Sequence, residues 1–171
     1  MTWNELKDKI DKENVRLESD PPQDVVRVIH YRIIDSESGT GGNVLGNWFF
    51  SFTDIRYVAA YLYQILNLAL DERFTDEQIR FMAARMISQP AEFAGYCGFN
   101  DLWFFVKTTL EVIEEIPDRE SLLSLLNAVF LYASHLHTWI NHYFPWVANY
   151  LFPPTGPADV EAMQSYLSGK E

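Results

Sequence analysis

The segment ASHLHTWINHYFPW, residues 133–146, has the side chains best suited to metal binding or acid–base chemistry, because it holds three histidines and no charged residue. On a helix, His135 and His142 would share a face but stand seven residues apart, about 10 Å along the axis. Two metal ligands on one helix are normally three or four residues apart. The spacing therefore predicts no metal site. It leaves a polar pocket along His135, Thr138 and His142, opposite the apolar stripe of the same helix.

A second candidate for chemistry is a group of carboxylates at residues 111–118. Acidic side chains on facing helices can hold Mg²⁺ for nucleotide hydrolysis, and the all-α enzymes that do so combine EExxE with ExxD. Here Glu115 and Asp118 match only the second pattern, Pro117 interrupts it, and no EExxE occurs. A Mg²⁺-dependent nucleotide hydrolase remains an alternative, and no cofactor is expected otherwise.

Two further segments look like known site motifs but lack essential residues. The glycine-rich stretch SGTGGNVLGN has no phosphate-loop lysine, and Asp35 and Glu37 precede it. Cys97 lies between glycines without a neighbouring base, so it is expected to be a packed side chain rather than a nucleophile. These segments predict a loop over residues 36–47 and no catalytic residue.

Composition predicts one domain, residues 1–171, because 48% apolar residues in a chain of this length can form a single core. The net charge of −11 disfavours direct contact with nucleic acid or anionic lipid. One cysteine and an N-terminus, MTWNELKDKI, without an apolar run predict a cytoplasmic protein. Residues 121–158 lack Asp, Glu, Lys and Arg, but their many Ser, Asn and His residues favour burial in protein over a membrane.

The expected fold is all-α, a bundle of about six or seven helices. Thr2 with Glu5 and Thr75 with Gln78 have capping-box spacing, and Asp20 precedes two prolines. These signals and the apolar periodicity predict helices near 3–14, 21–35, 55–69, 76–88, 101–116 and 119–144, with Asn100 and Asp118 as caps.

One region is ambiguous. The Val- and Ile-rich segment 25–34 weakly favours a helix, and the alternative is a small β-hairpin within 25–52 in which it pairs with WFFSF, residues 48–52. A short helix is expected to end near Tyr166, and the tail 168–171 is expected to be disordered.

Some aromatic side chains fall outside the apolar stripes, which is typical of protein-binding patches. Tyr57, Tyr61 and Phe104, with Glu111, Glu114 and Glu115, are the predicted partner-binding residues. The main functional prediction is a non-catalytic acidic domain of the inhibitor, immunity or adaptor type that docks on a basic protein. A helical bundle that binds a small apolar ligand is the other alternative. The oligomeric state stays open.

Overall fold

The computed structural model describes residues 1–19, 44–96 and 99–143, and these residues are helical apart from short connections. The elements are α1 (Trp3–Ser19), α3 (Val44–Ala69), α4 (Asp76–Tyr96), α5 (Asn100–Val112), the 3-10 helix η1 (Ile113–Glu115) and α6 (Arg119–Tyr143). Within those ranges there is no strand. The predicted all-α class is confirmed.

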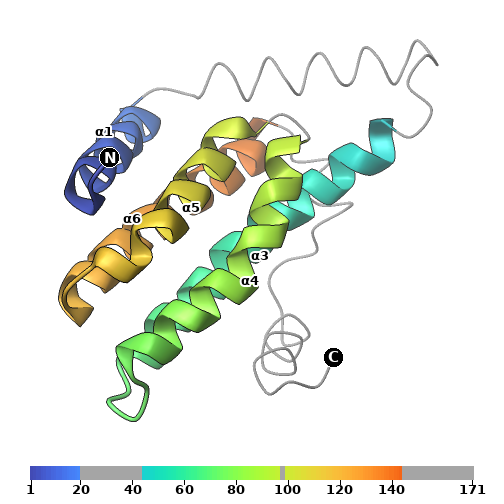
Figure 1. Ribbon diagram of the computed structural model, residues 1–171. Coiled ribbons are helices and arrows are strands. Elements are labelled where there is room, and N and C mark those ends of the chain that lie inside the picture. The colour runs from blue at the N-terminus through green and yellow to red at the C-terminus, as the bar shows by residue number, and fades with distance from the viewer. Residues whose placement is uncertain (20–43, 97–98, 144–171) are drawn as a thin grey trace.

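Helix α6 lies at the centre of the described bundle. It packs against α3, α1 and α5, while α4 packs against α3 and α5 (Figure 1). Figure 1 shows α3 and α6 running in opposite directions. Neighbouring helices therefore cover several sides of the part of α6 that follows Glu120, which has no Asp, Glu, Lys or Arg.

Three helices have the N-terminal capping hydrogen bonds that the sequence predicts. Thr2 Oγ1 accepts from the Glu5 amide at 3.2 Å, and a Glu5 carboxylate oxygen accepts from the Thr2 amide at 2.8 Å. Thr75 and Gln78 make the same reciprocal pair. Asp118 accepts from the Ser121 amide at 2.7 Å at the start of α6. These bonds satisfy amides that a helix leaves without an internal partner.

The predicted apolar stripes form the core. Ile55, Val58, Leu62 and Ile65 of α3 are fully buried. The inward residues of the other stripes are buried as well: Leu102, Phe105, Val106, Ile113, Ile116, Leu122, Leu126, Val129, Ala133 and Leu136. Periodicity alone therefore identified the core faces of α3, α5 and α6.

Three local predictions need correction or fall outside the described residues. Asn100 is not a cap: α5 begins at that residue, its N-cap is Phe99, and no side chain caps it. Helix α3 begins at Val44, so residues 44–47 are helix rather than loop, and 48–52 do not form a strand. The segments 21–35 and 144–171 and Cys97 lie outside the described residues.

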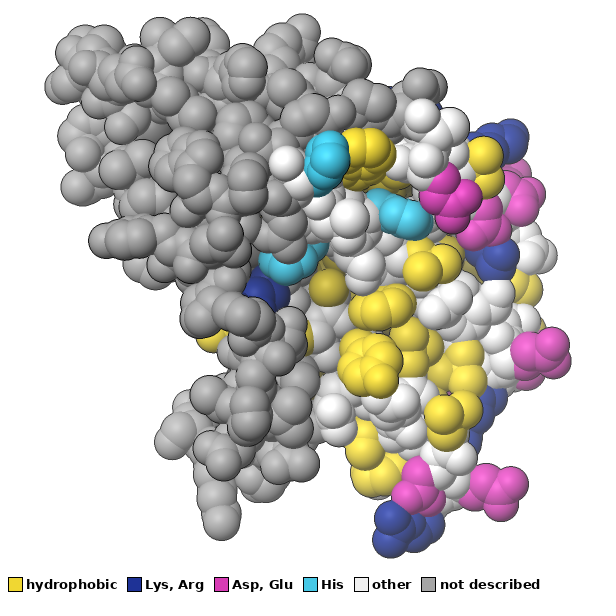
Figure 2. Space-filling view, turned by 180° about the vertical axis from the view of Figure 1, so that it is seen from behind, with side chains coloured by type: hydrophobic (Ala, Val, Ile, Leu, Met, Phe, Trp, Pro, Cys, Tyr) yellow, Lys and Arg dark blue, Asp and Glu magenta, His cyan; other side chains and the backbone are white. Residues whose placement is uncertain are grey.

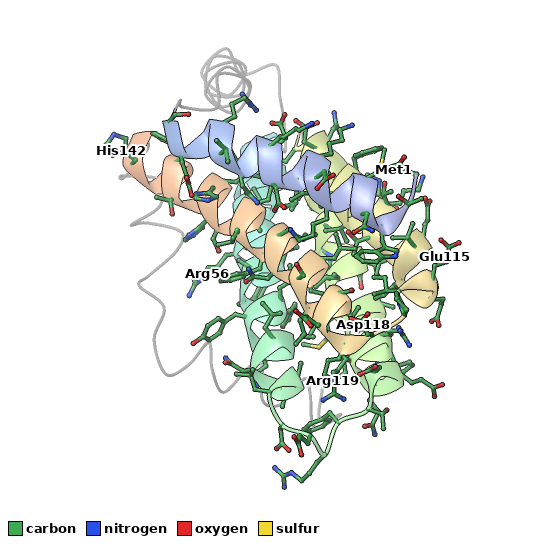
Figure 3. The ribbon with its side chains drawn as sticks, turned by 90° about the vertical axis from the view of Figure 1, so that its left-hand side faces the viewer. Met1, Arg56, Glu115, Asp118, Arg119 and His142 are labelled. Atoms are coloured by element: carbon green, nitrogen blue, oxygen red, sulfur yellow. The ribbon has the colours of Figure 1, made fainter. Side chains whose placement is uncertain are left out.

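Arg119 joins three parts of one end of the bundle. Its Nε donates to Asp76 Oδ1 at 2.7 Å, Nη1 donates to the Ala69 carbonyl at 3.4 Å, and Nη2 donates to the Phe74 carbonyl. The start of α6 is thereby fixed to the α3–α4 turn. Figure 3 shows Arg119 and Asp118 at this end and His142 at the other end of α6.

No described helix is both long enough and apolar enough to cross a membrane.

Replacing Arg119 with alanine should lower the free energy of unfolding by about 2 kcal/mol, because one charge-assisted bond and two carbonyl bonds are lost. Chemical denaturation measures the change. Arg73 is a matched control, since its pair with Asp71 is within a single exposed turn and its side chain is 84% exposed. An effect of Arg119→Ala no larger than that of Arg73→Ala would contradict the account of this end of the bundle.

Candidate functional site

The predicted partner-binding aromatics do not lie together. Tyr57 and Tyr61 of α3 are half-buried and stack on each other, with ring centroids 5.6 Å apart. Phe104 of α5 is 40% exposed, and Lys9 of α1 lies over its ring at 4.7 Å from the centroid. Phe104 therefore belongs to the α1–α5 side of the bundle, where a cation already covers one face of its ring.

The predicted acidic residues are at the end of α5 and in η1. Glu111, Glu114 and Glu115 are all exposed. In the described ranges no group of three or more His, Cys, Asp or Glu side chains could hold a metal ion. The structure gives these carboxylates a solvated position and no cation-binding geometry.

The three residues of the predicted polar pocket point in different directions. His135 Nε2 is 3.9 Å from a carboxylate oxygen of Glu18 in α1. Thr138 is exposed, and its hydroxyl donates to the Ser134 carbonyl at 2.9 Å. His142 is exposed and meets Trp139 edge to face, at 5.9 Å between centroids. The described contacts direct them toward α1, the backbone of α6 and the solvent.

The surroundings of the third histidine, His137, were not predicted from the sequence. It is half-buried, and its pKa is lowered first by burial and then by the positive charge of Arg56 on α3. Its imidazole is therefore neutral at neutral pH, beside a permanent cation. The two residues are 81 positions apart, so no local motif joins them. One signal was present in the sequence: Arg56 is the single basic residue of α3.

An aromatic pair lies along the same two helices. Tyr63 of α3 and Phe130 of α6 have ring centroids 5.9 Å apart, and Tyr63 is 54% exposed. Arg56 is seven residues before Tyr63, and His137 is seven residues after Phe130, as expected for antiparallel helices in one register. Ala60 and Ser134, both partly exposed, lie between the two pairs.

We call this surface the α3–α6 face, made of Arg56, Ala60 and Tyr63 of α3 and Phe130, Ser134 and His137 of α6. Tyr57 and Tyr61 lie about 100° further around α3 from Arg56 and Ala60. Figure 2 shows histidine side chains next to a group of hydrophobic side chains on the side of the molecule seen there, with acidic groups toward its edges. The chemistry of the α3–α6 face is one cation, a neutral imidazole, the exposed ring of Tyr63 and the partly buried ring of Phe130.

Comparison with known proteins assigns the family. Residues 3–143 match the family described as the cucumopine synthase C-terminal helical bundle domain. The chain belongs to this family. The match spans all the described helices, so the bundle is the family's domain.

One solved structure is similar to this chain in both fold and sequence. The structure described as McbB in complex with tryptophan superimposes with a TM-score of 0.74 and is 29% identical. The alignment covers 85% of this chain and 47% of McbB, so the chain spans about half the length of that relative. No curated protein matches the chain.

These comparisons overturn the main functional prediction. A non-catalytic inhibitor, immunity or adaptor domain that docks on a basic protein is wrong, because the family is a domain of a synthase. The prediction relied on net charge and on the absence of a motif. Net charge describes the whole surface, and a site built from single residues on separate helices leaves no motif.

His137 gives a testable dependence of stability on pH. Because its pKa is lower in the folded chain than its usual value near 6.5, the unfolded chain binds more protons as pH falls through that value. Its contribution therefore lowers the free energy of unfolding as pH falls. In His137→Gln, unfolding free energy should change less between about pH 7.5 and 5.5 than in the native chain.

Urea denaturation at both pH values measures this, with His142→Gln, an exposed histidine of the same helix, as control. An equal pH dependence in the native chain and His137→Gln would show that His137 is not held neutral.

Proposed function

We propose that this chain is a small-molecule-binding helical domain of an enzyme, and that its ligand is an amino acid with an aromatic side chain. The observation that carries the proposal is the 29% identity to McbB over 85% of this chain, since McbB was solved in complex with tryptophan. Membership in a family named for a synthase domain supports the enzymatic context. Because the chain spans 47% of McbB, the reaction of that protein is not transferred.

The chemistry of the α3–α6 face supports a ligand of this class. Exposed aromatic area at Tyr63 suits a ring, because planar side chains stack or meet edge to face with favourable energy. A nearby cation suits a carboxylate. Ligand sites in helical bundles are built from side chains on facing helices, and α3 and α6 pack against each other. The proposal thus develops the predicted alternative of a small apolar ligand, and it adds a carboxylate to that ligand.

We further infer a cytoplasmic location. One cysteine in 171 residues supports a reducing compartment, because it cannot close a disulfide within the chain.

Thermal unfolding with added amino acids tests the proposed function. Tryptophan at about a hundred times its Kd should stabilise the folded chain by about 2.7 kcal/mol and raise Tm by several degrees. Phenylalanine should stabilise less, because its ring offers a smaller surface. Alanine and glycine serve as controls, and neither should shift Tm. If no aromatic amino acid raises Tm above those controls, the proposed ligand class is wrong.

A further inference from the structure

One side of α6, between α3 and α1, carries six side chains that are exposed or half-buried. They are Leu123, Asn127, Phe130, Leu131, Ser134 and Thr138, and on a helix they fall within about 100° of one another. We call these six residues the α6 outer face. Its edge on the α3 side is the contact of Phe130 with Tyr63, and its edge on the α1 side is marked by His135 beside Glu18.

The α6 outer face has an apolar centre and charged surroundings. Leu131 is 39% exposed, and Tyr63 at the α3 edge is 54% exposed. Figure 2 shows hydrophobic side chains grouped on this side of the molecule, with acidic groups toward its edges. Protein interfaces have the same arrangement, an apolar centre with a polar rim.

The uncharged character of this face favours a second copy of the chain as its partner. The chain carries a net charge of −11, so two copies repel unless the surfaces that meet are free of charge. No Asp, Glu, Lys or Arg follows Glu120 in α6, and none follows Arg56 in α3. A different protein would be selected by complementary charge, which the α6 outer face does not have.

The polar groups of the face are also suited to contact with themselves. In a two-fold dimer the same surface is used by both copies, so each group meets groups of its own kind. The amide of Asn127 and the hydroxyls of Ser134 and Thr138 can each donate and accept a hydrogen bond, whereas a carboxylate only accepts. These side chains can therefore pair across a two-fold axis.

The available area is close to what a stable dimer needs. Helix α6 has 25 residues, so it is about 37 Å long. A surface along this length that reaches half-way over each neighbouring helix is about 20 Å wide, because packed helices lie 8–10 Å apart. The resulting area is roughly 700 Å² for each copy, and stable interfaces bury about 800 Å² for each partner.

We propose that the α6 outer face is an interface between two copies of this chain, and that the second copy covers a ligand held against Tyr63. Ligand sites bury most of the ligand, whereas the ring of Tyr63 is more than half exposed in one copy. The second copy completes the enclosure. The statement about the ligand rests on the proposed function, and the statement about the dimer does not.

Sedimentation equilibrium of the full chain without ligand tests the dimer. The native chain should have about twice the 19.9 kDa mass of one copy. Raising the salt concentration should not dissociate it, because the contact is uncharged and screening weakens the repulsion between copies. A native chain that stays monomeric at the highest soluble concentration, or a dimer that dissociates as salt rises, would overturn the proposal.

Substitutions then assign the dimer to this face. Leu131→Glu and Asn127→Asp each bring a carboxylate from both copies into the contact, so each should raise the dimer dissociation constant at least about tenfold. Phe81→Glu is the matched control, because Phe81 is 63% exposed on α4, and it should have no effect. Circular dichroism confirms that each variant is folded. If both folded variants on α6 dimerise as tightly as the native chain, the dimer uses another face and the assignment is wrong.

Thermal unfolding with tryptophan tests the statement about the ligand. Tryptophan should raise Tm less in monomeric Leu131→Glu than in the native chain or in Phe81→Glu, since the monomer leaves the ligand uncovered. An equal rise in all three would show that the second copy does not cover the ligand, and the proposed function would stand. If tryptophan raises Tm in none of them, the proposed function fails together with the statement about the ligand, and the sedimentation results decide the dimer separately.

Discussion

The burial of an uncharged helix is the constraint on which the rest of the structure depends. Helix α6 has no Asp, Glu, Lys or Arg after Glu120, and it is covered by α1, α3 and α5. Burying its apolar side chains stabilises the bundle, but its polar groups must then find partners inside the protein. Two such hydrogen bonds join α6 to α1. Asn14 donates to the Ala128 carbonyl of α6 at 3.0 Å, and Trp139 Nε1 donates to the Leu17 carbonyl of α1 at 2.9 Å.

The same constraint explains why the α3–α6 face is chemically distinct. Charged side chains are few on these two helices, since α3 has only Asp54 and Arg56 and α6 has no Asp, Glu, Lys or Arg after Glu120. The charge of Arg56 reaches His137 and, with burial, keeps that imidazole neutral. At the other end of the bundle, Arg119 has a different role. Its bonds to Asp76 and to backbone carbonyls join α6 to the α3–α4 turn.

Much of the fold could be predicted from sequence, because it depends on local signals. Capping boxes at Thr2 and Thr75 and the three-to-four-residue apolar spacing on α3 act within one or two helical turns. The start of α3 at Val44 was missed, since its glycine-rich surroundings favoured a loop. The electrostatic effect of Arg56 on His137 could not be predicted, because it depends on the register between two helices and the residues are 81 positions apart in the sequence. The functional prediction was wrong for a related reason. Net charge and the absence of motifs are properties of the whole chain, whereas a ligand is recognised by a few convergent side chains.

A crystal structure of the chain grown with tryptophan tests the central claim most directly. The account predicts tryptophan on the α3–α6 face, with its ring against the exposed ring of Tyr63. Tryptophan bound elsewhere, for example on the exposed side of α4 near Phe81, would contradict it.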